Sequence, residues 1–394
     1  MTQTWQDVEF IVCNNASVDD TASVVQSFAD PRIQLVGPAY RLSMRDNWEF
    51  ALGHAKGQYV TFIGDDDALM PGGLDRLARL LSLSKVEAVK WQSPTYFWPT
   101  VQSNNAGTID FTPGNAAAYI RSAAALNALR WGFLYYHFLP MIYHGAVAAS
   151  TIERIKAKDG VFFGCEVPDI YSGIAAAGTT PEYLYVQTPI TISGASRHSN
   201  GTSAMQSGSV QPGSPTAIFF SETKLGPHSE FISLADVPAI HASVFDALLW
   251  ARGRVLDRKY YLPVWYRIFL IMRELSMRDG IDLRSLNHPL RAYAKSRNLN
   301  WVYDLYLKIL PDRRLQKVDP GSASAWSKGT GRMIIDTNLF DVRDVYGAST
   351  FLAKLLSHIQ PEQPRLKITT SALLWARLAS KLSSHGLYRL FFPQ

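Results

Sequence analysis

The sequence predicts an α/β fold in its first half. Short apolar runs with β-branched and aromatic residues occur at residues 8–12, 33–36 and 59–63, and helical patterns lie between them. This alternation of strand and helix is typical of a parallel, doubly wound sheet. Each strand is followed by a polar loop, as expected where a strand ends at the edge of such a sheet.

The second half is expected to be mostly helical. Apolar residues recur with helical spacing at residues 241–250 and 301–307. A Gly/Ser/Pro-rich stretch between Ser199 and Pro215 separates the two halves and is typical of a linker or mobile loop. With 394 residues, of which 47% are hydrophobic, the chain is long enough for two domains, which we place at residues 1–205 and 206–394.

The first predicted strand, at residues 8–12, leads into the polar loop Asn14–Thr21. A helix with apolar residues at Val24, Val25 and Phe28 follows, and either Ser17 or Asp19 is expected to cap its N-terminus.

The next elements repeat this order. A strand at residues 33–36 precedes a helix at residues 47–57, which Gly57 is expected to end. The third strand, at residues 59–63, runs directly into three acidic residues, and Pro71 stops any continuation.

The acidic run consists of Asp65, Asp66 and Asp67. Three adjacent carboxylates repel one another, and the carboxyl end of a buried strand lies in the crevice where α/β sheets bind ligands. A divalent cation relieves the repulsion, and oxygen ligands suit Mg²⁺ or Mn²⁺, which also bind substrate phosphates. The alternative interpretation is a solvated acidic turn, because aspartate is common in turns.

These segments, taken in order, resemble the family 2 glycosyltransferases. The resemblance covers about residues 1–205 and rests on three features: the loop Asn14–Thr21 after a strand, the helix from Asn47 to Gly57, and the aspartate triplet with Pro71 four residues on. It implies a GT-A fold, a nucleotide-sugar donor, a divalent metal on a DXD-type motif and inverting transfer to an acceptor hydroxyl.

The resemblance also implies roles for individual residues. Asn15 takes the position next to the nucleotide base, Asn14 replaces a more usual aspartate, and Asp65 falls on the sugar–ribose position. The expected metal ligands are Asp66 and the next residue, Asp67. The full set expected to bind the donor is Asn14, Asn15, Asp19, Asn47, Asp65, Arg197 and His198.

Inverting transfer needs a base that takes the proton of the acceptor hydroxyl. The segment from Phe162 to Gly173 resembles the acidic acceptor-side motif of the family, and it contains Glu166 and Asp169. Asp169 follows Pro168 at an expected helix start, so we favour Asp169 as the base and keep Glu166 as the second candidate. A purely structural role for Asp169 at the helix N-terminus is the alternative.

The loop at residues 193–201 is rich in small and polar residues, and it resembles the loop that covers the donor diphosphate. Arg197 could hold a phosphate and His198 could be a further metal ligand. His144 lies in a strand–turn segment and is as readily explained by packing as by function.

Family members begin with one more strand and a Thr-Tyr-Asn-type turn. By this comparison the chain starts inside the first helix, about twenty-five to thirty residues late, so we expect the sheet to lack an interior strand and base binding to be weakened. A sheet without an interior strand exposes backbone edges.

Composition and motifs argue against a disulfide-rich, secreted, membrane-spanning or nucleic-acid-binding protein. Cys13 and Cys165 are too few for a disulfide framework, so a reducing compartment is expected. No N-terminal signal is visible and no apolar run reaches the length of a membrane span; residues 260–275 come closest. The chain carries no recognised zinc, helix-turn-helix or RNA-binding motif, so a nucleic-acid partner is not expected.

Charge differs between the halves. Residues 1–205 contain 14 Lys and Arg against 18 Asp and Glu, whereas residues 206–394 contain 25 against 15. Leucines at residues 371–392 accompany Arg377, Lys381 and Arg389, so this tail could lie on an anionic membrane. A docked helix with a solvated basic face is the alternative.

The sequence therefore predicts a metal-dependent inverting glycosyltransferase. Its acceptor would be a glycan or glycolipid of a surface polysaccharide, and the protein would be cytoplasmic with peripheral contact at the cytoplasmic face of a membrane. The alternative is a degenerate domain that binds nucleotide sugar or glycan, or scaffolds an assembly complex, without turnover.

Overall fold

The computed structural model describes most of the chain. The described residues are 3–101, 104–201, 203, 212–233, 236–237, 239–276, 278, 281–309, 325–327 and 332–359. The predicted basic tail at residues 371–392 lies outside them. Among the described residues, no helix is both long and apolar enough to cross a bilayer.

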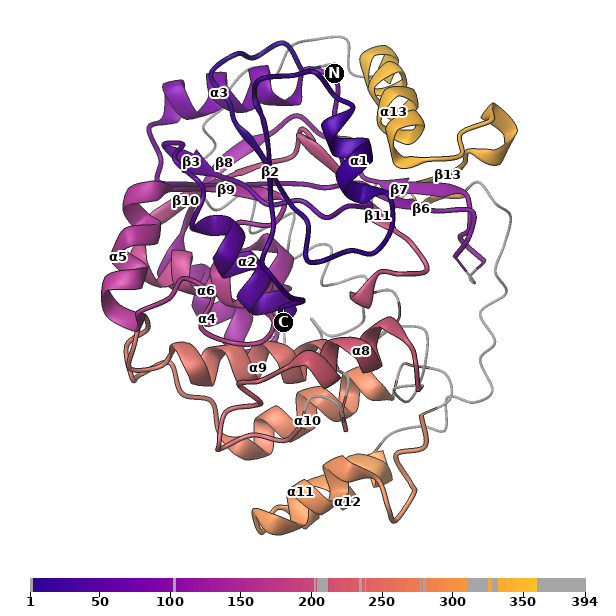
Figure 1. Cartoon of the computed structure of the whole chain (residues 1–394). Helices are drawn as coiled ribbons and strands as arrows, with labels where there is room; N and C mark the ends of the chain where they lie inside the picture. Colours follow the sequence, from indigo (N-terminus) through magenta and orange to yellow (C-terminus); the bar gives the residue numbers. More distant parts are fainter. Residues whose placement is uncertain are drawn as a thin grey trace.

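Strands alternate with or lie between helices in the first 200 residues, whereas the rest of the described chain is mostly helical (Figure 1). The strands are β1 Phe10–Cys13, β2 Ile33–Val36, β3 Tyr59–Val60, β4 Ala68–Leu69, β5 Ala88–Trp91, β6 Thr95–Phe97, β7 Thr108–Phe111, β8 Ala117–Arg121, β9 Gly145–Ala148, β10 Glu182–Val186, β11 Thr191–Ala195, β12 Ala325–Ser327 and β13 Arg332–Asp336. The α-helices are α1 Thr21–Gln26, α2 Met44–Leu52, α3 Gly73–Ser84, α4 Ser122–Arg130, α5 Ala149–Asp159, α6 Pro168–Thr179, α8 Pro215–Glu222, α9 Ile240–Ala251, α10 Val264–Leu275, α11 Pro289–Ser296, α12 Asn300–Ile309 and α13 Val345–Ile359. The described residues also include the short 3₁₀ helices η1 Tyr136–Phe138 and η3 Asn338–Phe340. The predicted α/β class with a mostly helical second half is confirmed.

The strands form three sheets. β1 and β2 make a parallel pair, a five-stranded sheet has the order β3-β9-β5-β10-β8, and a six-stranded sheet has the order β12-β13-β7-β6-β11-β4. The prediction of an all-parallel sheet is wrong, because β9 runs antiparallel to both β3 and β5. The strand–helix alternation on which the prediction rested does not extend beyond residue 84. It therefore gave no information about the direction of later strands such as β9.

The first elements match the prediction with shifted boundaries. The expected cap of α1 by Ser17 or Asp19 is not formed: Asp20 is the N-cap residue without a side-chain cap, and Asp19 instead accepts bonds from the Thr21 backbone and hydroxyl. Helix α2 begins earlier than expected, at Met44, because the Ser43 side chain accepts a hydrogen bond from the Asp46 amide.

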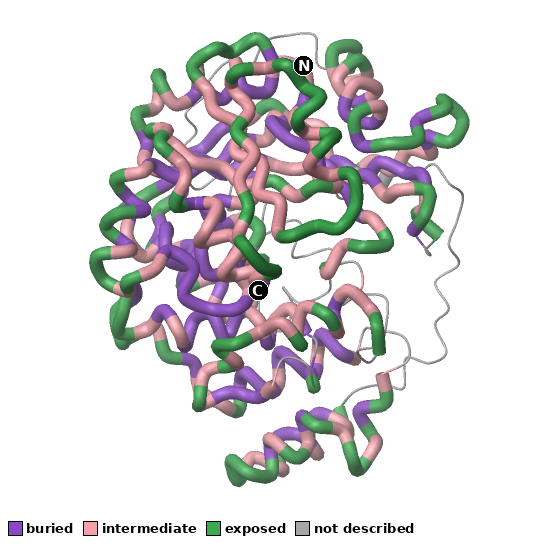
Figure 2. The backbone as a smooth tube through the Cα atoms, in the orientation of Figure 1, coloured by how far each residue is buried: buried purple, intermediate pink, exposed green. Residues whose placement is uncertain are grey.

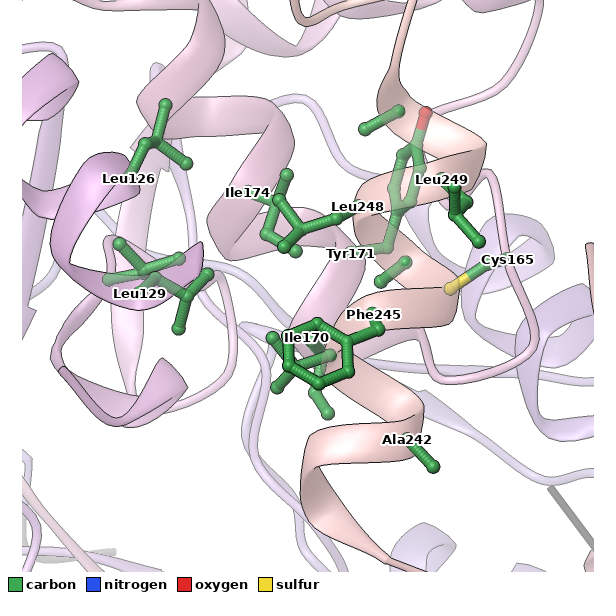
Figure 3. Close-up of a cluster of buried hydrophobic side chains, with 14 of the residues drawn as sticks. Leu126, Leu129, Cys165, Ile170, Tyr171, Ile174, Ala242, Phe245, Leu248 and Leu249 are labelled. Carbon is green, nitrogen blue, oxygen red and sulfur yellow. The ribbon is translucent and has the colours of Figure 1, made fainter. Parts of the chain in front are cut away.

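Burial increases along the first half of the chain. The segment of β1, α1 and β2 is intermediate or exposed, whereas β5, β9 and most of helix α6 are buried. Figure 2 shows the buried residues in purple. The largest apolar cluster joins helix α6 to helix α9, with Ile170 and Ile174 facing Phe245 and Leu248 (Figure 3). Helix α6 carries Asp169, so this packing fixes the start of that helix.

The second half of the chain also completes the sheets of the first half. Strand β13 pairs antiparallel with β7, and helix α13 contacts β4 and β11. Figure 1 shows α13 beside these strands, while α9 and α10 lie on the opposite side of the molecule. Residues 1–205 and 206–394 therefore share their cores, and their division into two domains stays a prediction.

Candidate active site

The three aspartates lie in the loop between β3 and β4, and their exposure falls along the loop. Asp65 is exposed, Asp66 is half-buried and the Asp67 side chain has no exposed surface. This graded burial gives three chemically different carboxylates from three identical residues.

Asp67 is the structural anchor of the loop. Its Oδ2 accepts hydrogen bonds from the Gly64 amide at 2.6 Å and the Tyr143 hydroxyl at 2.7 Å, and its Oδ1 accepts from the Gly194 amide at 2.8 Å. Burial raises the pKa of the Asp67 carboxyl, while these three bonds oppose the rise. Asp67 thereby fixes the acidic loop to β11 and to the segment before β9.

Asp66 is the carboxylate best placed to receive a cation. Burial raises its pKa, the hydroxyls of Ser199 and Ser196 lower it, and the charges of Asp67 and Asp65 raise it again. The Ser199 hydroxyl donates to Asp66 Oδ2. A half-buried carboxylate between two others is stabilised in its ionised form by a positive charge, so Asp66 and exposed Asp65 suit a hard divalent cation.

Beneath Asp67 lies a buried chain of polar side chains. Two hydrogen bonds lead to His144, whose Nε2 faces Asp67 without a hydrogen-bond partner among the described residues. The Trp91 indole donates to Thr191 Oγ1 at 2.7 Å, Thr191 Oγ1 lies 2.8 Å from His144 Nδ1, and His144 Nε2 lies 3.3 Å from Asp67 Oδ2. Burial, with the charge of Lys90, holds the His144 pKa well below its usual value, so the ring is neutral. Since the indole is only a donor, the arrangement favours a Thr191 hydroxyl that donates to Nδ1 and an Nε2–H that faces Asp67.

The loop after β11 meets the acidic loop through one of its serines. Ser199 bonds to Asp66, whereas Arg197 and His198 are exposed and bond to each other at 2.9 Å through Nε and Nε2. Across the part of the chain that the structure describes, no three His, Cys, Asp or Glu side chains form a metal-binding group.

The residues expected at the nucleotide hold local structure around β1. Asn15 bonds to both the amide and the carbonyl of Leu42, at 2.8 and 2.9 Å, and so joins the loop after β1 to the loop before α2. Asn14 accepts from the Ser17 amide at 2.8 Å. Asn47 Oδ1 accepts from the Cys13 thiol at 3.2 Å, which ties α2 to β1.

Asp169 lies in the first turn of α6, directly after Pro168. Burial raises the pKa of Asp169, and the charge of Lys90 acts in the opposite direction. Lys90 is only 3% exposed, and its ammonium donates to the carbonyls of Tyr143 and His144 at 3.2 and 2.9 Å. Because Tyr143 also binds Asp67, a short chain of contacts connects the surroundings of Asp169 with the acidic loop.

Glu166 has different neighbours. It is 4% exposed and accepts a hydrogen bond from the Leu225 amide, and burial raises its pKa. The charge of Arg45 lowers the pKa of Glu166 and the charge of Asp46 raises it. The charge of Glu166 in turn raises the pKa of Asp246. Glu166 thus ties α6 to the chain after α8, and its connections run away from the aspartate triplet.

Sequence reasoning did not assign Tyr143, Thr191, Gly194, Ser199 or Lys90 to the site. Tyr143 and Asp67 are 76 residues apart, and Gly194 and Asp67 are 127 apart. No local pattern connects residues at such separations. The pairing of β11 with β4 brings Gly194 to the acidic loop, and the pairing of β3 with β9, extended by a bridge between Phe62 and Tyr143, brings Tyr143 there.

Gly194 lies where no side chain fits. A Cβ at this position would lie 1.8 Å from the Asp66 carbonyl oxygen and 2.8 Å from Trp98 Nε1. Gly194→Ala is expected to push β11 from the acidic loop and to lower the free energy of unfolding by about 1–3 kcal/mol, the usual cost of overpacking. Chemical denaturation measures this. Gly201→Ala in the same loop is the control, since nothing lies within 4 Å of its Cβ; equal stability of the two variants would contradict the prediction.

Comparison with known proteins identifies part of the chain. The model of the family described as "Glycosyl transferase family 2" matches residues 1–146. The GalNAc(5)-diNAcBac-PP-undecaprenol beta-1,3-glucosyltransferase of Campylobacter jejuni subsp. jejuni serotype O:2 is 40% identical over 78 residues, which are 19% of this chain and 25% of that protein. The UDP-Glc:alpha-D-GlcNAc-diphosphoundecaprenol beta-1,3-glucosyltransferase WfaP of Escherichia coli is 28% identical over 86 residues, 22% of this chain and 34% of that protein. The matched region thus spans a quarter to a third of these relatives.

Two solved structures with similar chains contain a bound nucleotide or nucleotide sugar. TarS 1–349 of S. aureus in complex with UDP has a TM-score of 0.43 and 13% identity, and the match covers 79% of this chain and 86% of TarS 1–349. The mannosyltransferase PcManGT of Pyrobaculum calidifontis, in complex with GDP-Man and Mn²⁺, has a TM-score of 0.33 and 16% identity, with 78% and 79% covered.

The family match covers both the β1–α1 loop and the aspartate loop, which are the segments that carried the resemblance in the sequence. The α/β architecture with a helical second half agrees with the GT-A fold that this resemblance implied. Residues 1–146 of this chain are thus similar to glycosyltransferase family 2.

Proposed function

We propose that the protein is a metal-dependent, inverting glycosyltransferase that moves a sugar from a nucleotide-sugar donor to a glycolipid acceptor. The observation that carries this proposal is the state of Asp66, a half-buried carboxylate between two others in the part of the chain that matches the family. Such a group favours a cation, and the acidic loop offers Asp65 beside it as an exposed second carboxylate.

The roles of the residues follow from their surroundings. Asp66 and Asp65 would hold Mg²⁺ or Mn²⁺, and the ion would neutralise charge on the departing diphosphate. Asp67 stays a proposed member of the metal site and, through its bonds to Tyr143 and Gly194, sets the position of Asp66. Ser199 orients the Asp66 carboxylate, and Arg197 and His198 would meet the donor from the exposed side of the same loop.

Asp169 is the proposed base, with Glu166 as the second candidate. Its raised pKa makes Asp169 a better proton acceptor than an ordinary aspartate, and Lys90 favours the ionised carboxylate that a base requires. The proposed acceptor side therefore lies at the N-terminus of α6, which the packing against α9 holds in place.

The printed names of the two relatives suggest the substrates to try first. Both are beta-1,3-glucosyltransferases that act on undecaprenol-linked glycans, and one uses UDP-Glc. We therefore propose UDP-glucose as the first donor and a diphosphoundecaprenol-linked glycan as the acceptor, in surface polysaccharide assembly at the cytoplasmic face of a membrane. Contact with anionic lipid through residues 371–394 belongs to this proposal.

Thermal unfolding with a panel of nucleotide sugars tests donor binding. The matching donor with Mn²⁺ is expected to stabilise the fold by about 2.7 kcal/mol when its concentration is a hundred times the Kd, and EDTA should remove the effect. Transfer to a lipid-linked acceptor, with the product anomer assigned by NMR, tests turnover and inversion. Stabilisation without transfer to any acceptor would favour the degenerate protein that binds nucleotide sugar. No donor-dependent stabilisation would contradict the proposed enzyme and leave the alternative of a glycan-binding or scaffolding domain.

A further inference from the structure

The segment between helices α9 and α10 presents cations and aromatic rings to solvent. Arg258 and Lys259 are exposed, Tyr261 is 44% exposed and Trp265, in the first turn of α10, is 45% exposed. Lys259 lies 3.3 Å from Asp257, so part of this charge is paired at the surface. We call the exposed residues Arg258, Lys259, Tyr261 and Trp265 the basic–aromatic surface.

Beside Tyr261 lies an arginine that forms no ion pair with any residue that the structure describes. Arg267 is 2% exposed, and none of its three guanidinium nitrogens has a hydrogen-bond partner among the described residues. Its guanidinium lies 5.8 Å from the ring centroids of both Phe231 and Tyr261. A buried charge without hydrogen bonds is costly, because aromatic faces do not replace the hydrogen bonds that water gave it.

The Tyr261 ring is 44% exposed and lies beside the buried Arg267 guanidinium. On the same ring, at 5.4 Å from its centroid, lies the guanidinium of Arg252, which is itself paired with Glu230 at 3.1 Å. Arg252 therefore has an acidic partner, whereas Arg267 has none among the described residues. A rotation of the half-exposed Tyr261 ring would open Arg267 to an anion that reaches it from outside.

We propose that the basic–aromatic surface docks on an anionic phospholipid bilayer and that Arg267 binds a lipid headgroup phosphate when Tyr261 moves aside. Tryptophan and tyrosine rings are favoured at the membrane–water interface, and exposed cations are attracted to anionic headgroups. A guanidinium matches the geometry of a phosphate with two parallel hydrogen bonds. The phosphate supplies the partner that Arg267 lacks.

This inference extends the proposed membrane contact to a second segment of the chain, separate from residues 371–394. It also gives the proposed glycolipid acceptor a reason to meet the protein at the bilayer. Since its test reads lipid binding rather than sugar transfer, its failure can be told apart from failure of the proposed function, which is read from Mn²⁺-dependent donor binding and transfer.

Sedimentation with vesicles tests the surface on the full chain. Phosphatidylcholine vesicles with and without phosphatidylglycerol are compared for the wild type, the double variant Arg258→Glu/Lys259→Glu and Trp265→Ala. The double variant is expected to bind anionic vesicles at least tenfold more weakly, and Trp265→Ala several-fold more weakly. Trp301→Ala is the matched control, because Trp301 is 59% exposed on α12. Unchanged binding of both surface variants, an equal loss in the control, or equal binding of the wild type to both vesicles would overturn the proposal.

Arg267→Met tests the headgroup site. Because it removes an unpaired buried charge, the variant is expected to melt at the same or a higher temperature than the wild type in buffer, but to lose the extra stabilisation that anionic vesicles give. A lower melting temperature in buffer would show that Arg267 is satisfied within the fold and would overturn its assignment. Inorganic phosphate is the second probe. Equal stabilisation of the wild type by free phosphate and by anionic vesicles would overturn the proposal that the phosphate bound by Arg267 belongs to a lipid headgroup.

Discussion

Asp66→Ala is expected to abolish divalent-dependent binding of the nucleotide sugar. The substitution removes a half-buried carboxylate whose pKa is raised by burial and by the charges of two neighbouring aspartates. A cation stabilises the ionised form of such a carboxylate. Calorimetry with UDP or GDP and Mn²⁺ measures the effect, and Asp65→Ala should weaken binding less, since Asp65 is exposed and makes up the outer part of the loop.

A second variant separates the metal from the local hydrogen bond. Ser199→Ala removes the hydroxyl that donates to Asp66 but leaves the carboxylate in place, so it should retain most of the Mn²⁺-dependent affinity. If Asp66→Ala bound donor with the same Mn²⁺ dependence as the wild type, Asp66 would not be the metal ligand.

Asp169→Asn is expected to lower kcat by about 10²-fold or more while donor affinity changes little, which is the usual scale for losing a general base. The amide keeps the shape of the side chain but cannot accept the proton. Single-turnover kinetics with a lipid-linked acceptor, beside calorimetry of donor binding, measures both quantities. Loss of turnover in Glu166→Gln with an active Asp169→Asn would exchange the two roles.

The same base predicts a pH dependence. Because burial raises the pKa of Asp169, the ionised form is lost as pH falls through that raised value, and kcat should fall on the acid side. The pKa of Lys90 is lowered to about 7, so Lys90 is charged below that pH and there favours the ionised Asp169. Lys90→Met should therefore move the acid limb of the kcat profile to higher pH, a shift that a purely structural role of Lys90 would not produce.

The local elements of the site were predictable from sequence, and its long-range contacts were not. Strands β1 and β2, the aspartate loop and the helix that begins at Pro168 all have short-range signals: β-branched runs, an acidic triplet and a proline at a helix start. The bond from Tyr143 to Asp67 and the close approach of Gly194 to Asp66 depend on strand pairing, which leaves no trace in neighbouring residues.

The antiparallel insertion of β9 shows the same limit. Its four residues, Gly145–Ala148, are all buried, and a short apolar run of this kind has no polarity pattern that gives its direction. The sequence likewise carried no sign that β13 would return to β7, because that pairing unites residues more than 200 positions apart. Only the folded sheet specifies these neighbours.

The return of β13 to β7 has a consequence for biosynthesis. The ion pair between Asp110 and Arg332 joins positions 222 residues apart, so at bacterial or eukaryotic elongation rates of 5–20 residues per second roughly ten to forty seconds pass between their synthesis. During this interval the edge of β7 that β13 later covers has no strand beside it, although β6 can pair with the other edge. An open edge invites pairing with other chains. The nascent protein therefore spends much of its synthesis with an aggregation-prone edge, and a chaperone that shields residues 108–111 would act before the sheet next to the aspartate loop is complete.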